Sequence, residues 1–138
     1  MDSFDASTAK KQQPTATSQI TVEKFDGVVT VTFSDAIIAS SQEVLLLRED
    51  GHDPVFYIPF KDIYFDFLRK SATVTHCPHK GDASHWSVTA IGEAMDDVMW
   101  AYETPSASVA PIAGHGAFYA KKVRIEGVNN KTDQSIDL

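Results

Sequence analysis

The sequence predicts a mainly β domain of antiparallel sheets with one or two short helical turns. Short runs rich in Val, Ile, Thr and aromatic residues recur along the chain, and residue types that favour turns separate them. Residues 61–70 have apolar side chains near the three-to-four-residue spacing of a helix and are the best helical candidate. A single β-rich fold without internal repeats is therefore expected.

The first predicted hairpin joins residues 19–25 to residues 28–33. Asp26 and Gly27 lie between these runs, and both residue types tolerate the positive φ of a type I′ turn. An Asp-Gly pair between two alternating runs is a strong local hairpin signal. The two runs are therefore expected to pair with each other.

Three further strands are predicted before residue 60. Residues 37–38 and residues 43–50 suggest a second pair of strands. Residues 51–54 then form a turn, and residues 55–58 follow as the partner of 43–50. A proline on each side limits the length of this last strand.

Residues 61–70 are the best candidate for a helix. Asp62 can cap the first turn, while Ile63 and Phe67 fall on one face. The alternative is an extended segment, because Ile, Tyr and Phe also favour strands.

The second half of the chain is predicted to close the sheets. Residues 87–91 and 98–102 form a hairpin around Gly92, and residues 116–128 form one or two final strands. Alternation assigns the aromatic residues of this half to the core rather than to a stacking surface: Trp86, Trp100, Tyr102, Phe118 and Tyr119.

Length and composition predict one domain with two tails. The 138 residues, 43% of them hydrophobic, suffice for a single core over residues 19–128. Residues 1–18 are expected to be a disordered tail and residues 129–138 a flexible one, because both are poor in apolar residues. The net charge of −7 argues against nucleic acid as a partner. No run is apolar enough for a signal sequence or a membrane span, so a cytoplasmic location is expected.

Residues 75–87 concentrate residue types that carry chemistry. His76, His79 and His85 could ligate zinc with Cys77, but adjacent residues of a strand point in opposite directions and the spacing is poor for a metal. We therefore predict neither a metal nor a cofactor. A nucleophilic Cys77, activated by neighbouring histidines and Lys80, is a second interpretation. The alternative is a buried cysteine that acts as a small apolar residue.

A ligand loop is the third interpretation. Lys80 and Gly81 follow Pro78 in a predicted turn that offers an ammonium group and backbone amides to a carboxylate or phosphate. Arg48 and Glu49 end a strand whose predicted partner carries Tyr57, so these side chains could meet at one pocket mouth. The alternative is that these charged side chains are only solvated.

Five motifs occur in the order VLLLRE (44–49), PVFYIP (54–59), THCPHKGDASHW (75–86), MWAYETP (99–105) and IAGHGAFY (112–119). In these motifs the chain resembles the Domain of Unknown Function 427 family, from about residue 20 to residue 128. The resemblance implies a β-tent architecture of two small antiparallel sheets meeting at an angle, with a cleft between them. It also implies a zinc-free domain, because relatives of this architecture hold zinc with two Cys-x-x-Cys pairs and this chain has one cysteine. The family commonly has an aromatic residue where this chain has His79 and His85, which argues against zinc or catalytic roles for them. A nucleotidyltransferase activity, sometimes attached to the family, lacks the Gly-Ser pair and paired carboxylates it would need for magnesium.

The function expected from these features is binding of a small anionic molecule. His115 joins the candidates because its flanking glycines allow close approach. The alternatives are an enzyme that uses Cys77 or a histidine, and a protein interaction module, with homo-oligomerisation left open. The predicted ligand-binding residues are Arg48, Glu49, Tyr57, Cys77, His79, Lys80, Gly81, Trp86 and His115.

Overall fold

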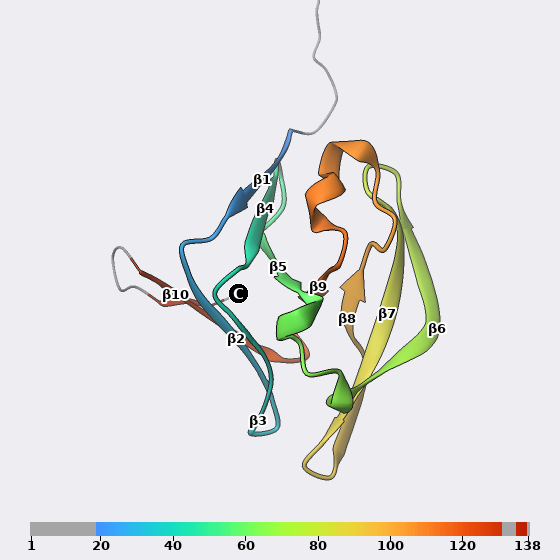
Figure 1. Ribbon diagram of the computed structural model, residues 1–138. Helices are drawn as coiled ribbons and strands as arrows, with labels where there is room; N and C mark the ends of the chain where they lie inside the picture. The colour runs from blue at the N-terminus through green and yellow to red at the C-terminus, as the bar shows by residue number, and fades with distance from the viewer. Residues whose placement is uncertain (1–18, 131–134, 138) are drawn as a thin grey trace, which may run out of the picture.

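The computed structural model describes residues 19–130 and 135–137. These residues form a seven-stranded and a four-stranded antiparallel sheet, and short 3₁₀ helices connect strands of the larger one (Figure 1). The mainly β fold predicted from the sequence is confirmed. The predicted tail over residues 1–18 lies outside the described residues. No helix in the described ranges is long and apolar enough to cross a membrane.

The larger sheet contains three hairpins, with turns at residues 50–54, 78–80 and 91–92. The first and third join strands that the sequence predicted as partners, whereas at residues 78–80 the sequence predicted the turn but not the strand pairing. Across the sheet the order is β1 (Ile20–Lys24), β4 (Leu45–Glu49), β5 (Val55–Pro59), β9 (His115–Phe118), β8 (Glu93–Ala101), β7 (Gly81–Ala90) and β6 (Leu68–Cys77).

The smaller sheet has a hairpin that the sequence prediction missed. Its strand order is β11 (Ser135–Asp137), β10 (Arg124–Asn129), β2 (Gly27–Phe33) and β3 (Ala36–Ser41). Strands β2 and β3 turn at Ser34 and Asp35, with φ values of 49° and 69° that a type I′ turn requires. Within the range predicted as a flexible tail, residue 129 ends β10 and residues 135–137 form β11, which pairs with β10.

The predicted hairpin at Asp26-Gly27 is wrong. Strand β1 pairs with β4 in the larger sheet, whereas β2 pairs with β3 and β10 in the smaller one. Gly27 is needed for another reason, because a Cβ there would collide with the carbonyl oxygen of Val128 on β10. The predicted pairing of residues 37–38 with 43–50 is wrong for the same topological reason, since β3 and β4 belong to different sheets.

The helix predicted over residues 61–70 is also wrong. Two single turns, η1 (Phe60–Asp62) and η2 (Phe65–Phe67), lead directly into β6. Between them, the Tyr64 amide donates to the Ile38 carbonyl at 2.9 Å, a tertiary bond that replaces a helical one. Asp62 accepts a 2.6 Å hydrogen bond from the Ser41 hydroxyl and makes no cap.

Two hydrophobic clusters cover the two faces of the larger sheet. The first packs alternate residues of β2, such as Val29 and Val31, against Phe56 and Ile58 of β5. The second packs the opposite face of the sheet against η3 (Ala107–Ile112).

Candidate functional site

A cleft opens where strands β5 and β9 separate. These strands pair at Ile58–Gly116 and Pro59–His115, and their ladder does not continue toward the start of β5. Two adjoining cavities open at this end, one polar and one apolar. The polar one, called here the polar cleft, has a volume of about 490 Å³.

The polar cleft is lined by charged, sulfur-bearing and aromatic side chains from seven segments of the chain. The titratable groups are Glu49, His52, Asp53, Cys77, His79 and Lys80. The rings are Tyr57, Trp100, Tyr102 and Tyr119, while Leu47, Val55 and Thr75 complete the lining.

The β6–β7 turn directs Lys80 into this cleft. The Lys80 amide donates to the Cys77 carbonyl at 3.2 Å, and the Lys80 carbonyl accepts from the Ser106 amide at 3.0 Å. Gly81 follows with a φ of +113°, a conformation that favours glycine. The lysine side chain then reaches Glu49 of β4, 2.8 Å from Nζ to Oε1. Since β5, β9, β8 and β7 lie between β4 and β6 in the sheet order, this contact requires a strongly curved sheet (Figure 1).

The Lys80–Glu49 ion pair is largely buried. Each side chain is 10% exposed. The hydrogen bond from Lys80 holds the pKa of Glu49 below its ordinary value, although burial acts in the opposite direction. The second carboxylate oxygen of Glu49 accepts no hydrogen bond from any residue that the structure describes. The pair therefore leaves an acceptor free at the floor of the cleft.

The rings of the cleft contact one another. Trp100 Nε1 donates to the Tyr57 hydroxyl at 3.3 Å, and the Trp100 and Tyr119 ring centroids are 4.4 Å apart. Burial raises the pKa of Tyr57 far above its ordinary value. Burial and the neighbouring Cys77 raise the pKa of Tyr102 to about 12. Both phenols are therefore neutral at physiological pH and can serve as hydrogen-bond donors.

His85 positions Tyr119 from behind the cleft. Its Nε2 lies 3.0 Å from the Tyr119 hydroxyl, and the two rings stack with centroids 6.0 Å apart. The Nδ1 atom of this 2%-exposed histidine is buried and has no hydrogen-bond partner within the described ranges. His85 thus contributes to the wall of the cleft through Tyr119 and not by lining it.

Cys77 lies beside Lys80 in the cleft. Its Sγ is 3.7 Å from Lys80 Nζ. The histidines expected around it are dispersed: His76 pairs with Asp82 at 2.7 Å on the exposed outer face, and His85 contacts Tyr119. Of the three histidines in residues 75–87, His79 lines the cleft. Within residues 19–130, no three His, Cys, Asp or Glu side chains are grouped closely enough to hold a metal ion.

The structure brings together five of the nine residues predicted for ligand binding. They come from β4, β5 and the end of β6 with its turn: Glu49, Tyr57, Cys77, His79 and Lys80. These segments are far apart in the sequence, and the curvature of the larger sheet makes them neighbours.

The other four predicted residues do not line the cleft. Arg48 precedes Glu49 on β4 and points to the opposite face, where it is 55% exposed and lies 3.4 Å from Glu23. Trp86 belongs to the core cluster between the sheets. His115 pairs with Pro59, at the end of the β5–β9 ladder that lies away from the cleft. Its Nδ1 atom is 2.9 Å from the carbonyl oxygen of Ala113 in the preceding loop. Gly81 shapes the turn without lining the cleft.

Sequence reasoning missed several residues of the cleft. Trp100 and Tyr119 were assigned to the core, yet both are only half-buried and line both cavities. His52, Asp53 and Thr75 were not among the residues predicted to bind a ligand. Alternation in the sequence predicts that Trp100 and Tyr102 lie on the same face of their strand. It does not predict whether other side chains pack against that face or leave a cleft there.

Comparison with known proteins gives one family. Residues 21–129 match the family described as Domain of unknown function (DUF427). None of the curated proteins matches the chain. The matched range contains every residue of the polar cleft and most of both sheets. The chain therefore belongs to the Domain of unknown function (DUF427) family.

Proposed function

We propose that the chain binds a small uncharged molecule in the polar cleft, through a carboxamide or a similar group that both donates and accepts hydrogen bonds. The observation that carries this proposal is the buried Lys80–Glu49 pair. Lys80 has three N–H donors, of which one contacts Glu49 Oε1 and one approaches Cys77. A ligand carbonyl can accept from the third donor while its N–H donates to the free oxygen of Glu49.

The charges of the cleft favour a neutral group over the anion expected from the sequence. Glu49 offsets the charge of Lys80 at 2.8 Å, and Asp53 adds a second carboxylate to the lining. An anion would approach two carboxylates and one ammonium group. Desolvating it there would cost more than it would gain from Lys80 alone.

The walls of the cleft suit a flat ring. Tyr57, Trp100, Tyr102 and Tyr119 supply aromatic surface. The volume of about 490 Å³ falls in the range of small-molecule sites, which combine apolar walls with a few polar groups.

Three probes of the same shape and different charge test this proposal: benzamide, benzoate and benzamidine. We expect benzamide to shift the indole N–H resonance of Trp100 in an NMR titration, while that of Trp86 in the core stays unmoved. Benzoate should bind more weakly. If none of the three probes shifts the Trp100 resonance, the proposed function is wrong.

A matched pair of variants tests the role of the ion pair. Glu49→Gln keeps the shape of the side chain and removes the charge that offsets Lys80, so benzoate affinity should rise by about tenfold or more. Arg48→Gln on the outer face of the same strand is the control and should leave all three affinities unchanged. Benzoate binding that is equal in wild type and Glu49→Gln would contradict the carboxamide assignment.

Thiol chemistry at Cys77 is a second candidate function, favoured by the 3.7 Å approach of Lys80 Nζ to Sγ. Lys80 Nζ donates to the sulfur atom, which is the nucleophile in this kind of chemistry. This candidate predicts that iodoacetamide alkylates Cys77 faster than free cysteine at neutral pH, and that Lys80→Met slows the reaction. A rate no higher than that of free cysteine would exclude it.

A further inference from the structure

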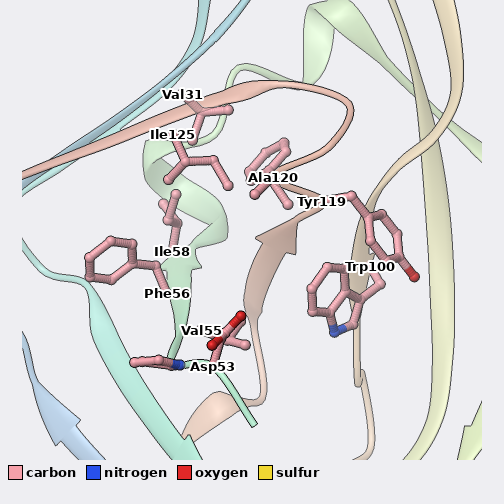
Figure 2. Close-up of a pocket in the computed structure, with 11 residues that line it drawn as sticks. Val31, Asp53, Val55, Phe56, Ile58, Trp100, Tyr119, Ala120 and Ile125 are labelled. Carbon is pink, nitrogen blue, oxygen red and sulfur yellow. The ribbon is translucent and has the colours of Figure 1, made fainter. Parts of the chain in front are cut away.

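The apolar cavity adjoins the polar cleft and has a volume of about 420 Å³. Figure 2 shows Phe56 and Ile58 on one side of it, Trp100 and Tyr119 on the other, and Val31 with Ile125 from the smaller sheet. The cavity thus lies between residues of the two sheets, whereas the polar cleft is lined by the larger sheet and its turns.

The two cavities share a wall. Asp53, Val55, Trp100 and Tyr119 line both of them. A molecule that stacks on the Trp100 ring in the polar cleft is therefore within reach of the apolar cavity at the same ring. The residues beyond this shared wall are apolar and buried, for example Val31 at 0% and Ile58 at 1% exposed.

Beyond the shared wall, the side chains that line the apolar cavity carry no polar group: Val31, Pro54, Phe56, Ile58, Phe118, Ala120 and Ile125. Asp53 is the charged residue that lines it within the described ranges, and Asp53 belongs to the shared wall. When a ligand group enters this cavity, the free energy of binding becomes more favourable in proportion to the apolar area removed from water. The chemistry of the cavity selects an alkyl chain or an unsubstituted ring.

We infer that the ligand of this domain is amphipathic, with a carboxamide head at Lys80 and Glu49 and an apolar tail that occupies the cavity between the sheets. This inference rests on the proposed function and adds the class of molecule. The tail contributes affinity, whereas the head determines orientation.

A series of benzamides with unbranched 4-alkyl chains tests the tail. Isothermal titration of the ethyl, butyl and hexyl compounds should give a dissociation constant that falls about fourfold for each added methylene until the cavity is full. The methyl resonances of Val31 and Ile125 should shift with the longer chains and not with benzamide itself.

Two variants separate the head site from the tail site. Ala120 is exposed and lines the apolar cavity but not the polar cleft. Ala120→Trp should therefore block the tail and abolish the dependence of affinity on chain length, while benzamide still binds. Thr75 is exposed and lines the polar cleft but not the apolar cavity. Thr75→Trp should therefore weaken the binding of every compound in the series. Ala120→Ser is the control for substitution at the turn and should behave as wild type.

The outcomes distinguish this inference from the proposed function. If benzamide binds and the affinity does not rise with chain length, the tail site is wrong and the head site stands. A gain with chain length that persists in Ala120→Trp places the tail elsewhere and also overturns the inference. If no member binds, the proposed function fails and the tail site fails with it.

Discussion

At the scale of single residues, the Lys80–Glu49 pair is the most unusual feature of the molecule. Removing two charges from water is costly, and apolar pairs of similar volume are often at least as stable. A largely buried ion pair is therefore weak evidence for stability, which agrees with the ligand-binding role proposed for it. Its two members nevertheless depend on each other, because either charge alone would be buried without a partner.

This dependence predicts a strong coupling in stability. Lys80→Met should lower the free energy of unfolding by about 3 kcal/mol, because it leaves the Glu49 carboxylate buried and unpaired. The double variant Glu49→Leu/Lys80→Met should recover most of this loss. Urea unfolding of the wild type, both single variants and the double variant measures the coupling. If the two single effects simply add, the pair is not energetically coupled.

The same pair predicts a dependence on pH. The folded-state pKa of Glu49 is depressed below the ordinary 4.5, so its stabilisation is fully present above that pH. The stabilisation is lost as the pH falls through the lower folded-state value. As the pH falls below 4.5, the free energy of unfolding should therefore fall less steeply in Glu49→Gln than in wild type. Asp97 and Glu103 also have lowered pKa values and provide the slope common to both proteins. Equal slopes would contradict the assignment.

At the scale of elements, local turn chemistry predicted some hairpins and misassigned others. The turn at Gly92 was found because it joins two runs that pair within the same sheet. Gly27 produced the same signal, but it is required by the approach of β10, which is about a hundred residues away in the sequence. The helix predicted at residues 61–70 failed because tertiary bonds to β3 replaced helical ones. Local patterns therefore located most strands, and identified partners only where a short turn joins two strands of the same sheet.

The β2–β3 turn yields a prediction about stability. Ser34 and Asp35 both have positive φ, which Asn and Gly adopt at lower cost. The double variant Ser34→Asn/Asp35→Gly should raise the free energy of unfolding by about 1 kcal/mol, measured by urea unfolding. Gly27→Ala is the contrasting variant and should lower it, because the new Cβ would collide with the Val128 carbonyl. A stabilising Gly27→Ala would contradict the assigned role of this glycine.

At the scale of the whole molecule, a glycine determines how closely the sheets approach. A Cβ at Gly127 of β10 would lie 2.9 Å from the Phe56 ring of β5. Phe56 also forms a wall of the apolar cavity (Figure 2). The distance between the sheets and the shape of the cavity therefore depend on the same contact.

This contact predicts an overpacking effect. Gly127→Ala should destabilise the protein by about 1–3 kcal/mol, because Phe56 must move away from a tightly packed position. Phe56→Leu in the same chain should relieve part of this cost by removing the ring atoms nearest to residue 127. A double-mutant cycle of urea unfolding measures the coupling. Additive effects would mean that the two sheets adjust without strain at this point.

The sequence by itself determined the mainly β class, the family motifs and the hairpins closed by nearby turns, because these depend on alternation and on residues within one turn of each other. The tertiary structure alone decided which candidate residues share a site. Glu49 and Lys80 are 31 positions apart and meet through the curvature of a seven-stranded sheet, whereas Arg48 is turned to the opposite face by the pleat of the same strand. The half-buried state of Trp100 and Tyr119 was likewise decided by the separation of β5 from β9, since no local pattern encodes where two distant strands stop pairing.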